Sequence, residues 1–430
     1  MSNTNVDPNI WNISLNSSFK PSSPTKKSKI IGKNISFKGK ETYIYQYKDI
    51  TIIGYGRIYN EYDLWTIILN ISPPYLKIHP LMIVIELYRK FGFEKTLEYL
   101  EGDFSFLLFD INIYGEEALL YVVRDALGLS PLYQWIPNTN SKKVQFYNET
   151  TDINQIQYLF SSAISTTENI DNLINEPIQN GTYLVFTHSF KVSANWKYKN
   201  TVHYYKLPFH STYEKDTKYK PYLQEIEISI TKRIRYILTN ESRMYNNEET
   251  EYICEEYKNI QNTIKEQINT IKKTKNIIGV IVFDDNDDND NNKRELSKNM
   301  VDILIKNENL VDYKIISFVD KNTNELEEKY PTVIQQIKKY LNNNDPSIIR
   351  AYFIPLIIAK YIKENEPQIR YVFMGEPFIY KWIFTNIFDR REELNDVFFQ
   401  ERLKGWIDAF FEYDIELMIP YLDRTLLQKI

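Results

Sequence analysis

Apolar and polar residues alternate in short runs through the first half of the chain. The alternation covers residues 34–37, 42–47 and 50–59, and it returns at 102–110 and 118–125. A period of two residues predicts strands with one buried face, and the last two runs predict an antiparallel hairpin. We therefore expect an antiparallel sheet in this half.

A different pattern interrupts these strands. Ile83, Leu87, Tyr88 and Leu97 recur at helical spacing within residues 80–100, which predicts helical structure there. Residues 126–133 turn the chain into another strand, and residues 181–186 predict a further one.

From about residue 210 helical segments alternate with short, fully apolar runs. The runs at 277–283, 314–319 and 370–374 are typical of strands buried on both faces. Strand and helix alternation predicts right-handed crossover units around a parallel sheet. The second half is therefore predicted to be α/β, and the first α+β. The helical segments are 222–238, 249–274, 293–305, 323–341 and one that opens at Pro346.

The first residues have a third character. Residues 1–28 are polar and rich in serine, which predicts a disordered tail. Together with the change of pattern near residue 208, this divides the chain into a tail at 1–28, a first domain at 29–208 and a second domain at 209–430. A length of 430 residues is enough for two sizeable cores.

Composition excludes several classes of protein. A net charge of −5 gives no support for nucleic-acid binding, and no apolar run is long enough to span a bilayer. The single cysteine, Cys254, excludes an internal disulfide framework, and the first residues lack a signal-peptide core. We expect a cytoplasmic protein that binds neither membrane nor nucleic acid.

Five short sequence blocks in the first half occur in the order that is typical of one family. They are Gly56-Arg-Ile-Tyr-Asn60, residues 100–110, residues 124–133, Phe160-Ser-Ser-Ala-Ile164 and residues 177–183. This succession resembles the glutaminase domain of the asparagine synthetase family, a class II glutamine amidotransferase with an N-terminal nucleophile. The resemblance implies an Ntn-type αββα sandwich. Its structural frame is kept at Tyr59, Asn60, Asp110, Arg124, Asp125 and Pro131.

The residues that the family uses for chemistry differ. Its nucleophile is an N-terminal cysteine, and this chain has no cysteine before Cys254. Ser2 could take that place after removal of Met1, but it lies in a polar tail rather than at the start of a strand.

The family's glutamine pocket is altered as well. Its Asn-Gly-Glu motif supplies an oxyanion donor and a carboxylate for the glutamine amino group, and the same positions here are Tyr55, Gly56 and Arg57. A second family carboxylate corresponds to Pro80. These four residues are predicted to line a vestigial glutamine pocket, because a guanidinium repels an ammonium group.

The second half resembles the ATP-pyrophosphatase domain of the same family. The family's phosphate loop, built from small residues, corresponds to residues 283–288, and the segment 284–290 holds five aspartates. Carboxylates repel phosphate where free backbone N–H groups would cradle it. A later acidic motif keeps only Glu376, and Met418 stands where the family has an arginine. We predict a vestigial nucleotide site at Phe283, Asp284, Asp285, Asp287, Asp288, Gly375 and Glu376.

A metal site is the other interpretation of the aspartates. The segment lacks the spaced ligands and the glycine of an EF-hand, which favours a solvated loop without metal.

Three interpretations of function remain. The first is a pseudoenzyme that keeps the asparagine-synthetase fold for binding, regulation or structure, with no catalytic residues and no cofactor. The second is an ATP-dependent asparagine synthetase, fed by ammonia or glutamine, which would use ATP and magnesium with Asp287, Glu376 and Asp423. The third is an assembly subunit that binds protein through exposed aromatic residues. We expect an unidentified protein partner, and the resemblance implies a homodimer.

Overall fold

The computed structural model describes most of the predicted elements. The described residues are 12–15, 28–30, 35–38, 44–70, 81–111, 117–137, 158–162, 173–189, 196–205, 223–245, 278–284, 313–319, 331–341, 346–374 and 397–429. They group into two compact units, the first formed mostly by residues up to Lys206 and the second by those from Leu207 on.

The first unit contains two antiparallel sheets. One has the strand order β12-β11-β7-β6-β5-β4, and the other has the order β10-β8-β9-β1-β3-β2. The strands of the β5 sheet are β4 (Ile44–Tyr47), β5 (Ile50–Ile58), β6 (Gly102–Asp110), β7 (Glu117–Arg124), β11 (Thr182–Ser189) and β12 (Lys197–His203). Those of the β1 sheet are β1 (Asn12–Leu15), β2 (Ser28–Ile30), β3 (Ile35–Lys38), β8 (Tyr133–Pro137), β9 (Tyr158–Ser161) and β10 (Leu173–Pro177).

Two cores lie on opposite faces of the β5 sheet. Ile53, Leu107 and Phe160 belong to the core between the two sheets, because Phe160 comes from β9 of the β1 sheet. Ile52 and Phe106, one residue away from Ile53 and Leu107, belong to the core beneath the helices. This alternation is the period of two that the sequence predicts.

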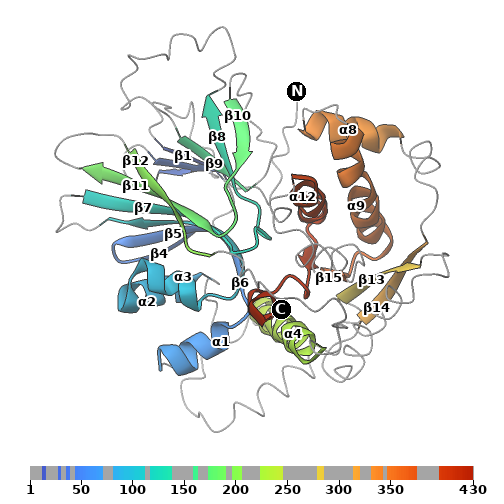
Figure 1. Ribbon diagram of the computed structural model, residues 1–430, viewed down its shortest axis with the longest axis horizontal. Coiled ribbons are helices and arrows are strands. Elements are labelled where there is room, and N and C mark those ends of the chain that lie inside the picture. Colours follow the sequence, from blue (N-terminus) through green and yellow to red (C-terminus); the bar gives the residue numbers. More distant parts are fainter. Residues whose placement is uncertain are drawn as a thin grey trace, which may run out of the picture. The chain divides into compact units, whose positions relative to one another are not determined.

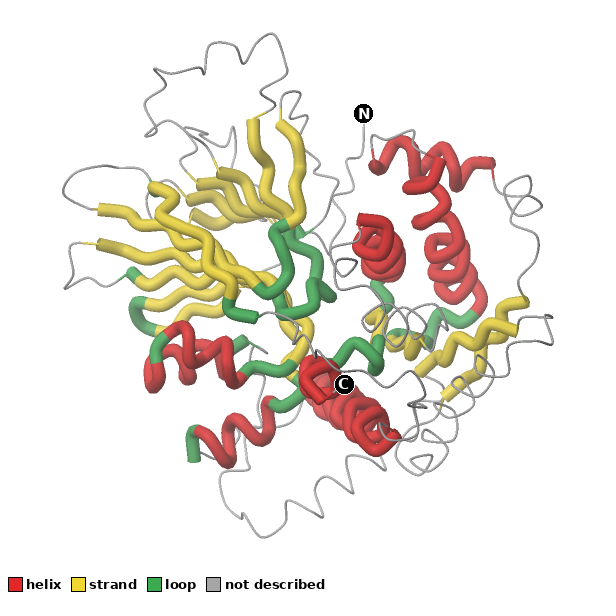
Figure 2. The backbone as a smooth tube through the Cα atoms, in the orientation of Figure 1, coloured by secondary structure: helices red, strands yellow, loops and turns green. Residues whose placement is uncertain are grey.

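Helices cover the second of these faces. Figures 1 and 2 show α2 and α3 along the β5 sheet, and their apolar residues share a core with its strands. No described helix of this unit lies against the outer face of the β1 sheet, so the described residues carry one of the two predicted helix layers. The helices are α1 (Glu61–Asp63), the π-helix η2 (Leu64–Ile68), α2 (Met82–Phe91) and α3 (Phe93–Tyr99).

One expectation for this unit needs correction. The tail predicted at 1–28 contains β1, whose four residues pair with β3 on one side and with β9 on the other. The helical pattern at 80–100 is confirmed as two helices, divided at Gly92, which adopts φ 81° and ψ 173°, a conformation that L-residues with side chains rarely adopt. The predicted hairpin is confirmed as β6 and β7, which pair antiparallel.

The second unit contains a parallel sheet, as predicted. Its strands, in spatial order, are β14 (Tyr313–Val319), β13 (Ile278–Asp284), β15 (Tyr371–Met374) and β16 (Glu416–Met418). β13 pairs parallel with β14 on one side and with β15 on the other. After β14 the chain therefore returns across β13, which makes the β13–β15 border the point where the strand order reverses. In open α/β sheets ligands bind beyond the carboxyl ends of the strands at such a point.

The second unit also contains helices, of which the structure describes some. The helices predicted at 249–274 and 293–305 lie outside the described residues, as do residues 323–330 of a third. The elements are α4 (Leu223–Tyr245), β13 (Ile278–Asp284), β14 (Tyr313–Val319), α8 (Pro331–Leu341), α9 (Pro346–Asn365), β15 (Tyr371–Met374), α12 (Val397–Glu412), β16 (Glu416–Met418) and α13 (Arg424–Lys429). Within the described parts of the chain, no helix is long and apolar enough to cross a membrane.

A buried ion pair joins α4 to the last turn before α13. Arg233 Nη1 lies 3.2 Å from Asp423 Oδ2, and the Arg233 side chain is only 1% exposed. Asp423 Oδ1 also accepts hydrogen bonds from the backbone N–H groups of Thr425 and Leu426, so it caps α13. Burial raises the pKa of Asp423, but the positive charge of Arg233 and these hydrogen bonds outweigh it and hold the pKa below its ordinary value.

We predict that Arg233→Leu destabilises the second unit by about 3–5 kcal/mol, because it leaves a buried carboxylate without its cation. Urea unfolding gives the loss of stability, and hydrogen exchange shows α13 losing protection first. The control is Lys360→Leu, which removes an exposed pair 4.0 Å long with Glu364 and should change stability by less than ~0.5 kcal/mol. Equal losses in the two variants would contradict the role of the buried pair.

Candidate functional site

Three of the four predicted glutamine-pocket residues lie on β5, on two different faces. Tyr55 and Arg57 share a face with Ile53, which points into the core between the two sheets. Gly56 points the other way, and a Cβ atom there would stand 2.3 Å from Leu81 Cδ2. Gly56 is therefore required by the close packing of Leu81. Pro80 lies outside the described residues.

Arg57 is held by a carboxylate of the neighbouring strand. The register of β5 and β6 sets Arg57 directly opposite Asp103. Arg57 Nη2 lies 3.0 Å from Asp103 Oδ2, and the two side chains are 7% and 3% exposed. Tyr59 donates a hydrogen bond to the same carboxylate oxygen. The charge of the guanidinium is thus neutralised inside the protein.

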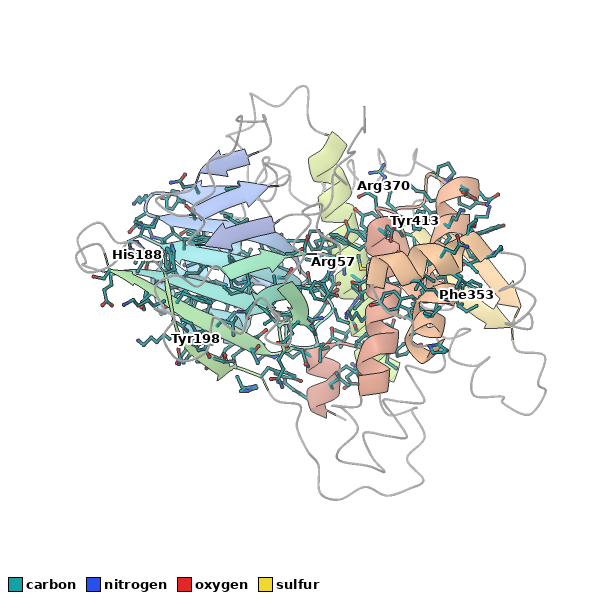
Figure 3. The ribbon with its side chains drawn as sticks, turned by 90° about the horizontal axis from the view of Figure 1, so that it is seen from above. Arg57, His188, Tyr198, Phe353, Arg370 and Tyr413 are labelled. Carbon is teal, nitrogen blue, oxygen red and sulfur yellow. The ribbon has the colours of Figure 1, made fainter. Side chains whose placement is uncertain are left out.

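An aromatic ring flanks the same guanidinium. The guanidinium carbon of Arg57 lies 5.8 Å from the centre of the Tyr55 ring, which is a cation–π distance. In Figure 3, Arg57 and His188 lie toward opposite ends of the antiparallel strands, which matches the strand pairing. The Arg57 end is the one at which β7 leads into the loop at Asp125.

This loop extends the polar cluster. Arg124, opposite Ser105 in the strand register, donates to the carbonyl oxygens of Ser130, Gly128 and Ile178. Ser105 and Ser130 are joined through their hydroxyl oxygens, 2.9 Å apart. The cluster therefore links β5, β6 and β7 to the following loop.

The side chain of Asp125 holds the loop in place by binding the loop's backbone N–H groups. Its carboxylate accepts hydrogen bonds of 3.0, 3.0 and 2.7 Å from the N–H groups of Leu127, Leu129 and Ser130. Burial, and then the negative charge of Asp103, raise the pKa of Asp125 to about 6, against the opposing effect of Arg124. Arg57, Asp103, Arg124 and Asp125 thus form a buried cluster of two guanidiniums and two carboxylates at this end of the sheets.

The sequence does not single out Asp103. The pattern over Gly102–Asp110 predicts a strand with a buried face, and Asp103 and Ser105 lie on that face with Leu107. A carboxylate on a buried face needs a positively charged partner. Arg57, in another predicted strand, was the available signal, but only the strand register shows that the two are opposite each other.

The predicted nucleotide-site segments follow neighbouring strands of the second unit. Asp284 is the last residue of β13, and Gly375 follows Met374, the last residue of β15. Asp285, Asp287, Asp288, Gly375 and Glu376 lie outside the described residues, as do the side chains of Phe283 and Asp284. The parallel pairing of β13 with β15 brings the carboxyl ends of these two strands to the same side of the sheet.

No metal centre emerges within the described ranges, where no group of three His, Cys, Asp or Glu side chains is placed to hold an ion. Met418, at the position of the family's arginine, is fully buried in β16.

Comparison with known proteins identifies a domain family for part of the first unit. Residues 31–153 match the family described as glutamine amidotransferase domain. The first unit thus contains a class II glutamine amidotransferase domain, and the match includes β5, β6, β7 and the loop at Asp125. The chain has no match among curated proteins.

We predict that Arg57→Leu destabilises the first unit by about 3–5 kcal/mol, because Asp103 is then buried without a cation. The double variant Arg57→Leu, Asp103→Leu removes both charges and should lose less than the single variant. Urea unfolding measures both losses, and hydrogen exchange of β5 and β6 localises them. A double variant less stable than Arg57→Leu would argue against a coupled pair.

The raised pKa of Asp125 predicts a pH dependence. The folded protein binds the proton of the Asp125 carboxyl more tightly than the unfolded chain, since its pKa is about 6 in the fold against an ordinary value of 3.8. This contribution to stability is complete below the unfolded pKa and is lost as pH rises through the folded one. Relative to Asp125→Asn, which cannot titrate, the wild type should gain about 2 kcal/mol between pH 7 and 4.5.

Urea unfolding of both proteins at several pH values measures this difference. A constant offset between them would reflect only the hydrogen bonds to the loop. The prediction fails if the wild type loses stability relative to Asp125→Asn as the solution is acidified.

Proposed function

We propose that the chain is an asparagine-synthetase-like pseudoenzyme, which keeps its fold as a binding, regulatory or structural body. The observation that carries the proposal is the buried Arg57–Asp103 pair. In the family that the sequence resembles, position 57 offers a carboxylate to the amino group of glutamine. Here it offers a guanidinium, and a carboxylate of the protein itself neutralises that charge.

The energy of the Arg57–Asp103 ion pair opposes binding of a glutamine amino group at this position. Freeing Asp103 for an incoming ammonium group would require Arg57 to leave a partner 3.0 Å away in a buried site. Breaking a buried pair of this kind costs about 3–5 kcal/mol. The amino group of glutamine would have to offset that cost before any chemistry began.

The lack of a cysteine nucleophile in the first unit is the second support for the proposal. The chain has no cysteine before Cys254, so no thiol of the first unit can attack an amide. Together with Tyr55 in place of the oxyanion donor, this removes both the attacking group and the group that would stabilise the intermediate.

The second unit supports the same proposal through charge. The segment that begins with Asp284 at the end of β13 holds five aspartates in residues 284–290. A triphosphate brought to the reversal point of the sheet would meet like charges, which are strongly unfavourable at short range. No ATP and no magnesium are expected, and the protein would act through an unidentified protein partner in the cytoplasm.

A second candidate function is ATP-dependent amidation of aspartate. The parallel sheet with its reversal point between β13 and β15 favours it, because this topology is the usual place for a nucleotide. Of the residues that this candidate retains, Asp287 and Glu376 lie outside the described residues. Asp423 is occupied in pairing with Arg233 and capping α13, so it already has a structural role.

We predict that the full-length protein releases no glutamate from glutamine above the buffer rate and binds no Mg-ATP at micromolar concentrations. An enzymatic glutamate assay and isothermal titration calorimetry measure the two quantities, with an active glutamine amidotransferase as the positive control. Glutamine hydrolysis or micromolar ATP binding would overturn the proposal. Pyrophosphate release that requires both aspartate and ammonia would instead establish the second candidate.

A further inference from the structure

We propose that Asp103 forms a subsite for an organic cation of the alkylguanidinium or primary ammonium class, and that Arg57 fills this subsite from within the chain. The inference rests on the proposed function, because it names the ligand chemistry of the same altered site. It adds that the recognition elements remain assembled beneath the side chain that occupies them.

The anionic side of the subsite is built by the strand register. Asp103 on β6 stands opposite Arg57 on β5, and it is 2% exposed. Its Oδ2 atom receives Arg57 Nη2 at 3.0 Å and the hydroxyl of Tyr59. The Tyr59 hydrogen bond holds the carboxylate in place independently of Arg57, so the acceptor stays oriented when the cation is removed.

A second carboxylate strengthens the preference for a cation. Asp125 is close enough to Asp103 for the two negative charges to influence each other. Arg124 supplies one positive charge against these two carboxylates, and its guanidinium donates to three backbone carbonyl groups of the loop region. Arg57 balances the second negative charge, which favours a positive group at its position.

The aromatic side of the subsite is Tyr55. Its ring centre lies 5.8 Å from the guanidinium carbon of Arg57 and shares the strand face with it. A carboxylate on one side and an aromatic ring on the other is the arrangement by which proteins recognise organic cations. A planar guanidinium satisfies both contacts better than a compact ammonium group.

The consequence is that truncating Arg57 creates a vacancy with a defined chemical preference. In Arg57→Ala, Asp103 keeps Tyr59 but loses its counter-charge. A soluble cation that binds the folded state and not the unfolded chain then stabilises the protein by mass action. The same cation cannot act on the wild type, where Arg57 already occupies the site.

The experiment measures melting temperature against methylguanidinium chloride at low millimolar concentrations. We expect a saturable rise for Arg57→Ala, with a smaller rise for methylammonium. The wild type and Arg57→Lys keep a tethered cation, and the double variant Arg57→Ala, Asp103→Ala lacks the carboxylate, so none of these should respond. Sodium chloride at equal ionic strength controls for salt.

Two outcomes overturn the inference. One is a melting temperature of Arg57→Ala that does not respond to methylguanidinium, and the other is an equal rise in the double variant. Should Arg57→Ala fail to fold alone, it is refolded with methylguanidinium or with sodium chloride. Recovery with methylguanidinium alone supports the subsite, and equal yields in the two salts exclude it.

The two proposals fail separately. Glutamine hydrolysis by the wild type would overturn the proposed function and leave the response of Arg57→Ala untouched. Absence of that response would overturn the subsite, while the wild type could still be catalytically inactive.

Discussion

A buried charge must meet its partner inside the protein, and this requirement shapes both units. In the first, the register of β5 and β6 sets Arg57 opposite Asp103 between two sheets. In the second, Arg233 reaches from α4 to Asp423 and thereby fixes the turn before α13. Each pair ties together segments that are distant in the sequence, and neither charge can be withdrawn without leaving the other stranded in a poorly solvated interior.

The pair in the first unit lies in the part of the chain that matches a known domain family. A match to a glutamine amidotransferase domain covers residues 31–153, yet position 57 has the sign of charge opposite to that which the family resemblance implies. Arg124 and Asp125, in contrast, bind backbone groups and hold the loop of the domain. Their role follows from the fold alone and requires no substrate.

The sequence predicts much of the fold because periodicity is a local property. The β6–β7 hairpin and the parallel strands β13, β14 and β15 follow from runs of apolar residues. It does not predict the break at Gly92, which depends on the conformation of a single residue, or β1, whose place in a sheet depends on partners far along the chain. Asp103 was missed for the same reason, since its role exists only once the register of two strands is known.

The position of β1 has a consequence for how the first unit is assembled. β1 lies between β3 and β9, and Asn12 pairs with Ser161. One neighbour of β1 is therefore synthesised much later than β1 itself. Contacts over such separations make folding slow, because a long loop must close before they form. Until β9 has been synthesised, β1 presents an unpaired edge, where a second nascent chain could add its own strand.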